Sequence, residues 1–82
     1  MLKIYTKSKN GYCILAKQYL DENNIKYREI NLSLKKNEKD KKYWKKVGVN
    51  TLPIITEDES NWVLPEWDEE LFEYLYSLPR GE

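Results

Sequence analysis

The sequence predicts a small α/β domain in which helices flank a four-stranded mixed sheet, in the chain order β-α-β-α-β-β-α. Short segments rich in β-branched and aromatic residues, at 2–6, 25–32 and 51–56, are typical of strands. Between them lie segments with apolar residues at helical spacing. The chain has 82 residues, of which 40% are hydrophobic. We therefore expect a single domain, 1–82, with one modest core.

The first half of the chain predicts a βαβ unit. Residues 2–6, "LKIYT", form the first expected strand. Asn10 suits a helix N-cap, because its side-chain carbonyl can accept a hydrogen bond from a free amide of the first turn. The helix should run from about residue 11 to 23, with Cys13, Ala16, Lys17 and Leu20 at helical spacing. Residues 25–32 predict a second strand, which a right-handed crossover would place parallel to the first.

The middle of the chain predicts a second helix, a third strand and a hairpin. Residues 37–46, "NEKDKKYWKK", form the expected helix, with Asn37 as its cap and Tyr43 and Trp44 as its apolar contacts. Pro53 belongs at the start or edge of the third strand, because proline has no amide to donate. The acidic turn "EDESN" then predicts a hairpin over 54–64.

The end of the chain, "PEWDEELFEYLYSL", predicts the last helix. Pro65 and Asp68 mark its start. Its expected apolar stripe consists of Trp67, Leu71, Tyr74, Leu75 and Leu78.

Composition excludes several kinds of site. The lone cysteine, Cys13, excludes an internal disulfide and a cysteine-built zinc site, and the lack of histidine excludes imidazole base chemistry. We expect neither a metal nor a nucleotide cofactor. The formal net charge of zero gives no overall attraction to nucleic acid or membranes. With a free cysteine, no signal-peptide pattern and no apolar run of membrane-spanning length, we expect a cytoplasmic monomer.

Three motifs resemble the glutaredoxin family and its thioredoxin-like fold. "IYTKSKNGYCILAK" is similar to that family's active-site strand, loop and helix, with Tyr12 and Cys13 in register with the second half of its Cys-Pro-Tyr-Cys motif. "NNIKYREINL" resembles its second strand, and "GVNTLPIIT" its Thr-Val-Pro strand. The family's Gly-Gly-x-Asp motif would fall on residues 65–68.

The resemblance implies a glutathione site. It implies that Pro53 is cis, and that the extended backbone at Thr51 and Leu52 pairs with a peptide-like ligand in the manner of an added strand. Lys7 would meet a carboxylate of glutathione, and Asp68 its ammonium group. Pro53 could instead simply begin a strand, Lys7 could be a solvated loop residue, and Asp68 a helix cap.

Two departures from the family pattern bear on activity. Asn10 occupies the position of the family's nucleophilic cysteine and cannot attack a disulfide. Cys13 matches the second cysteine, one turn into the helix, where it is either a reactive thiol or a buried small hydrophobe. Pro65 offers no amide and Glu66 adds a negative charge where the family has glycines, so glutathione should bind more weakly.

These features leave three functional hypotheses. The first is a thiol–disulfide oxidoreductase or glutathione-binding redox protein that acts through Cys13, with glutathione, protein disulfides or ribonucleotide reductase as partners. The second is a non-catalytic module that recognises proteins in the same groove. The third is a stand-alone domain resembling the N-terminal part of glutathione transferases. It is suggested by the similarity of "LPEWDEELFEYL" to a stretch of that family, and it ranks last.

Charge is unevenly distributed along the chain. Lysines crowd residues 35–46, whereas acidic residues crowd 57–73. The two segments could be solvated helix faces that attract each other weakly. Alternatively, the lysine-rich segment could dock an acidic partner.

Overall fold

The computed structural model describes residues 1–78, and its helices and strands follow the predicted order. The elements are β1 (Leu2–Thr6), α1 (Gly11–Glu22), β2 (Arg28–Asn31), the short 3-10 helix η1 (Lys35–Asn37), α2 (Glu38–Lys46), β3 (Ile54–Glu57), β4 (Trp62–Leu64) and α3 (Glu69–Tyr76). The sheet order is β2-β1-β3-β4. Strand β1 is parallel to β2 and antiparallel to β3, and β3 is antiparallel to β4. The predicted mixed α/β sheet is confirmed.

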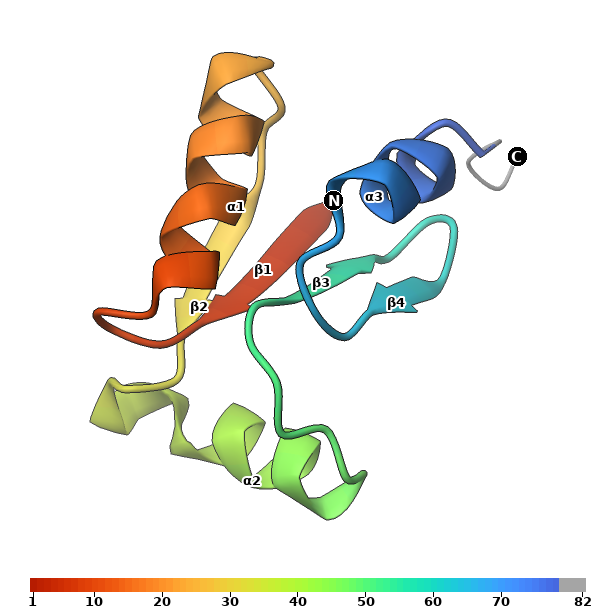
Figure 1. Cartoon of the computed structure of the whole chain (residues 1–82). Helices are drawn as coiled ribbons and strands as arrows, with labels where there is room; N and C mark the ends of the chain where they lie inside the picture. The colour runs from red at the N-terminus through yellow and green to blue at the C-terminus, as the bar shows by residue number, and fades with distance from the viewer. Residues whose placement is uncertain (79–82) are drawn as a thin grey trace.

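Alternation along the strands divides the core between the two faces of the sheet. Leu2 and Ile4 of β1 face α1 and α3, and pack with Leu20 and Phe72 in the larger cluster. Tyr5 faces the other way and belongs to the smaller cluster, which consists of Tyr5, Leu32, Trp44 and Ile54. The rings of Tyr5 and Trp44 meet edge to face with centroids 5.2 Å apart. Figure 1 accordingly shows α2 away from α1 and α3, across the sheet.

This layering places the two charged helices on opposite faces of the sheet. The lysine-rich helix α2 covers one face of the sheet through Trp44, whereas the acidic helix α3 covers the opposite face through Phe72. The sheet therefore separates them. None of the ion pairs found within residues 1–78 joins α2 to α3.

One strand boundary and one helix cap differ from the prediction for local reasons. The second strand begins at Arg28 and not at residue 25, because the Ile25 amide donates to the Leu20 carbonyl at 2.9 Å and closes the end of α1. Asn37 precedes α2 but does not cap it with its side chain. Its Nδ2 instead donates to the carbonyl of Asn31 at 2.8 Å, which ties the start of α2 to the end of β2.

The predicted apolar stripe of the last helix is correct for Trp67 and Leu75, which pack against the core, and wrong for Leu71 and Tyr74. The helix begins only at Glu69, after Asp68, whose Oδ1 accepts a hydrogen bond from the Leu71 amide at 3.0 Å. Phe72, which the predicted stripe omits, is the fully buried residue of α3 at 1% exposure. Leu71 and Tyr74 are 43% and 62% exposed. Trp67 lies before the helix and packs on its first turn against Phe72.

The third strand is shorter than predicted, and only one of the two expected aromatic contacts of α2 reaches the sheet. Strand β3 begins at Ile54, so residues 51–53 precede it as a loop. In α2, Trp44 is buried but Tyr43 is 57% exposed, so only the tryptophan provides the apolar contact with the sheet. None of the helices within residues 1–78 is long and apolar enough to cross a membrane.

Candidate functional site

The loop after β1 ends at Asn10, which caps α1 as predicted. Its backbone is extended, and its Oδ1 accepts a hydrogen bond from the amide of Cys13 at 3.0 Å. One of the free amides of the first turn is thereby satisfied. At the position that the resemblance assigns to a nucleophile, this chain therefore has a neutral side chain whose oxygen is hydrogen-bonded to the helix.

Cys13 lies one turn inside α1 on the face that packs against the sheet. It is 1% exposed. Burial raises the pKa of the Cys13 thiol above its ordinary value of 9.0, although a hydrogen bond with the Lys7 backbone and the charge of Lys17 oppose this shift. The thiol is consequently protonated at neutral pH and shielded from solvent, which makes it a weak nucleophile in the closed fold.

The same end of α1 is tied to β2 through a polar network. Thr6, which is 1% exposed, donates to the Glu29 Oε2 at 2.7 Å. Lys17 forms an ion pair with the same carboxylate, with Nζ and Oε2 3.2 Å apart. Thr6 and Lys17, which both lie in the stretch "IYTKSKNGYCILAK", therefore meet on one glutamate. This arrangement fixes the helix against the sheet on the side where Cys13 is buried.

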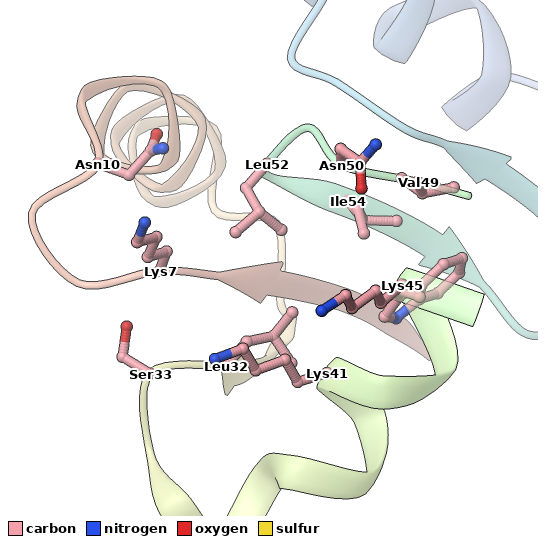
Figure 2. A pocket seen from close by; sticks show the side chains of 11 residues that line it. Lys7, Asn10, Leu32, Ser33, Lys41, Lys45, Val49, Asn50, Leu52 and Ile54 are labelled. Atoms are coloured by element: carbon pink, nitrogen blue, oxygen red, sulfur yellow. The ribbon is translucent and has the colours of Figure 1, made fainter. Parts of the chain in front are cut away.

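A hollow of about 340 Å³ opens between the N-terminus of α1 and helix α2. Lys7, Asn10 and Leu52 border it on one side, and Trp44 and Ile54 form part of its apolar floor. Figure 2 shows Lys7 and Asn10 beside each other at one end, with Leu52 above the floor. A ligand in this hollow would meet ammonium and amide groups around an apolar base.

The segment before β3 carries the cis proline that the resemblance implies. The Leu52–Pro53 peptide bond is cis, and Pro53 is buried. Within residues 1–78, neither the amide nor the carbonyl of Leu52 forms a backbone hydrogen bond. These two groups stand next to the hollow and are available to an extended peptide backbone.

The structure brings only part of the predicted site together. Lys7, Asn10 and Leu52 line one hollow, whereas Cys13 is not among its lining residues. Tyr12 is 65% exposed on α1 and lies outside the hollow.

Two other predicted residues also have structural partners. The Thr51 Oγ1 donates to the Pro65 carbonyl at 2.6 Å, which joins the cis-proline segment to the loop before α3. Asp68 caps α3 through Oδ1, as its alternative interpretation predicts.

Sequence reasoning missed the contribution of α2 to this hollow. Lys41, Trp44 and Lys45 line it from the helix, and Ser33 and Asn50 from adjoining loops. The lysine-rich segment was evident, and the i, i+4 spacing of Lys41 and Lys45 was a usable signal that both share a face. Which face turns towards Lys7 depends on the packing of Trp44 onto the sheet.

A metal site finds no support in the described part of the chain. Residues 1–78 contain no group of three or more His, Cys, Asp or Glu side chains arranged to hold an ion.

Comparison with known proteins identifies the family. The glutaredoxin family model matches residues 2–60. The chain belongs to the glutaredoxin family. The match includes α1, the cis proline and β3, and it ends before Pro65 and Asp68.

Curated glutaredoxins show the same relationship over part of their length. Glutaredoxin 1 of Rickettsia prowazekii is 45% identical over 53 residues, which cover 63% of this chain and 56% of that protein. Glutaredoxin 1 of Rickettsia conorii is 43% identical over 53 residues, which cover 63% of this chain and 52% of that protein. The chain thus spans about half the length of the curated relatives it matches.

Solved structures show the same fold. The thioredoxin-like protein BC3987 has a TM-score of 0.74 at 20% identity, and the match covers 92% of this chain and 99% of that one. Glutaredoxin 1 from Francisella tularensis, complexed with cacodylate, has a TM-score of 0.51 at 27% identity. The match covers 79% of this chain and 76% of that one. The thioredoxin-like fold of this glutaredoxin-family chain is confirmed.

The environment of Cys13 predicts a slow thiol. At pH 7 we expect iodoacetamide to alkylate the folded protein at least about tenfold more slowly than the urea-unfolded chain, because the thiol must first become exposed. The rate should keep rising as the pH passes 9, since the raised pKa of Cys13 moves thiolate formation to higher pH. Mass spectrometry of the labelled fraction against time measures this directly, because every label reports the single cysteine. Equal rates in the folded and unfolded protein would contradict the burial of the thiol.

Proposed function

We propose that this glutaredoxin-family domain binds glutathione, or a similar peptide thiol, in the hollow beside Asn10 and takes part in thiol–disulfide exchange through Cys13. The observation that carries the proposal is the meeting of Lys7 and the unpaired backbone of Leu52 at one hollow by the N-terminus of α1. The Leu52 amide and carbonyl would pair with the ligand backbone, and Lys7 with a ligand carboxylate.

The exchange itself follows ordinary thiol–disulfide chemistry. The Cys13 thiolate attacks the glutathione sulfur of a mixed disulfide, a new disulfide forms between Cys13 and glutathione, and the substrate leaves as a thiolate that takes a proton from water. The thiolate of a second glutathione then attacks the glutathione sulfur of that disulfide. This releases oxidised glutathione and restores Cys13. Each cycle consumes one free glutathione, and the other half of the oxidised glutathione comes from the mixed disulfide.

The burial of Cys13 limits this chemistry. Because Cys13 is 1% exposed, its sulfur cannot approach the sulfur of a disulfide along the axis of the bond to be broken. The first turn of α1 must therefore open locally before each attack. The hydrogen bond from the Cys13 amide to Asn10 is the contact that such an opening would break. We therefore expect slow turnover in comparison with a family member that carries an exposed cysteine at the helix terminus.

The same burial favours a second candidate function. With Asn10 at the rim of the hollow and Cys13 outside it, the groove could bind a peptide without any covalent step. The domain would then be a recognition module that keeps the family's groove and lacks its nucleophile.

The two candidates are separated by one variant and two measurements. Glutathione-dependent reduction of a small mixed disulfide should be measured on the unaltered chain and on Cys13→Ser, and glutathione binding should be followed by amide chemical shifts. Activity that disappears in Cys13→Ser, with binding retained, supports exchange through Cys13. Binding without activity in either protein supports the recognition module. The absence of shifts around Leu52 in both folded proteins would contradict glutathione binding, and with it the first candidate.

Asp68 allows a test of the ligand's other end. If Asp68 meets the ammonium group of glutathione, Asp68→Asn should weaken binding up to about fivefold, as for an exposed ion pair. Stability should change by about 0.5 kcal/mol or less, because asparagine is an equally good cap. Asp68→Ala should cost about 1 kcal/mol, because it leaves the Leu71 amide without its acceptor. Urea unfolding and a glutathione titration measure the two effects. Unchanged affinity in Asp68→Asn would leave Asp68 as a cap alone.

A further inference from the structure

The hollow beside Asn10 is bordered by three ammonium groups and no carboxylate. Lys41 and Lys45 lie one turn apart on α2, and Lys7 extends from the end of β1. Figure 2 shows the two α2 lysines reaching across the hollow towards Lys7. None of the lining residues is acidic. The positive charge therefore comes from two segments far apart in the sequence that the fold brings to one surface.

These lysines have no partner of opposite charge in the described part of the chain. The ion pairs among residues 1–78 involve the N-terminus, Lys3, Lys17 and Lys42, and none includes Lys7, Lys41 or Lys45. Like charges held around a small volume repel one another and attract an anionic ligand. Glutathione carries one net negative charge and would neutralise only part of this field.

The positive surface also extends beyond the first hollow. A second hollow of about 390 Å³ shares Leu32, Ser33, Lys41 and Lys45 with it and adds Lys35 and Lys42. Its single acidic lining residue, Glu38, is already paired with Lys42 at 3.8 Å. The two hollows form one track from the end of β1 across α2, with Leu32 in the apolar floor of both.

We infer that this track binds an extended acidic segment of a partner protein, with acidic side chains against Lys7, Lys41 and Lys45 and an apolar side chain on the floor. The inference rests on the proposed function, because it assigns a partner class to the same groove. Charge complementarity selects an acidic ligand, and the shared apolar floor selects a polypeptide with apolar side chains.

Nucleic acid fits the surface less well than an acidic peptide. Trp44 is 8% exposed and has its ring against Tyr5, so it offers no open face on which a base could stack. The chain has no net positive charge, and the acidic residues of α3 lie across the sheet. A long polyanion would be repelled by that side of the molecule.

The test uses a fluorescein-labelled peptide of about ten residues with alternating glutamate and leucine, long enough when extended to follow the track. Fluorescence anisotropy should show binding that weakens as salt is added. Lys41→Gln combined with Lys45→Gln should weaken it about tenfold, from the loss of two charge contacts. The matched control is Lys39→Gln combined with Lys46→Gln, which removes the same charge from the same helix outside both hollows. The control should bind within about twofold of the unaltered chain.

Other outcomes would overturn the inference. Equal weakening in the two double variants would mean general attraction to α2 and not a defined track. Tighter binding of single-stranded DNA of similar length would assign the surface to nucleic acid. Binding of glutathione with shifts around Leu52, but no binding of the acidic peptide, would overturn the inference while leaving the proposed function intact. Failure to bind glutathione would count against the proposed function and not against the acidic track, which the peptide titration tests separately.

Discussion

Asn10→Cys is expected to raise glutathione-dependent reduction of a small mixed disulfide about 100-fold above that of the unaltered chain. A thiol at the helix N-terminus faces free amides and the positive end of the helix dipole, which lower its pKa towards 7 or below. Position 10 also lines the hollow, whereas Cys13 does not.

The size of the effect follows from acidity and access together. At pH 7, a thiol with a pKa near 7 is about half thiolate, whereas one above 9 is less than about 1% thiolate. The lower nucleophilicity of the more acidic thiolate offsets about tenfold of this difference. The difference in access to the two thiols more than makes up for this tenfold reduction, because Cys13 must be exposed by a local opening before each attack.

Two controls show whether the new thiol acts through the groove. Asn10→Ser keeps a capping oxygen and provides no sulfur, so its activity should equal that of the unaltered chain. Asn10→Cys combined with Lys7→Gln should keep the reactive thiol but lose affinity for glutathione, which appears as a higher KM. If Asn10→Cys is folded and alkylated rapidly but shows no gain in activity, the hollow does not bind glutathione productively.

Phe72→Ala is expected to lower the free energy of unfolding by about 3–5 kcal/mol, the largest loss predicted for a single substitution here. Phe72 is 1% exposed and lies among four aromatic rings. The centroid distances are 5.8 Å to Tyr19, 6.2 Å to Trp62, 5.7 Å to Trp67 and 5.4 Å to Tyr76. Truncation leaves a cavity beneath α3 and removes edge-to-face contacts with Tyr19 and Trp62, a tilted contact with Trp67 and a stacked contact with Tyr76.

Urea unfolding followed by tryptophan fluorescence measures this loss. Since a domain of this size is usually stable by about 5–15 kcal/mol, Phe72→Ala should lose much of its stability. Phe72→Leu keeps most of the volume and provides a folded comparison, with an expected loss below about 2 kcal/mol. The neighbouring Leu71→Ala is the matched control. At 43% exposure it should cost about 1 kcal/mol or less. Equal losses at positions 71 and 72 would contradict the observed register of α3.

The order of helices and strands was predictable because it depends on residues close together in the chain. Strand β1 has the expected bounds, and α1 begins at the expected residue because Asn10 provides a side-chain acceptor three residues before an amide that needs one. The parallel pairing of β1 with β2 follows from the helix between them. The family motifs pointed to the same order, and the match of the glutaredoxin model agrees with it.

The second strand and the last helix show where local patterns were insufficient. Residues 25–27 alternate like a strand, but the amide of Ile25 is used to close α1. In α3, several registers place apolar residues on one face. The choice of Phe72 depends on its fit against Trp62 of the distant strand β4 and Tyr19 of α1.

Local periodicity and capping therefore determined which segments form helices and strands and that Asn10 caps the first helix, and the sequence motifs carried the resemblance to glutaredoxins. Tertiary packing alone decided that the Cys13 thiol is buried and that Lys41 and Lys45 face Lys7. The physical reason is distance along the chain. A cap or an amphipathic pattern involves residues within one or two turns, whereas the hollow exists only where β1, α2 and the segment before β3 meet. The packing of Trp44 against Tyr5 and Ile54 fixes the position of α2 on the sheet. It therefore also fixes which lysines a partner would contact.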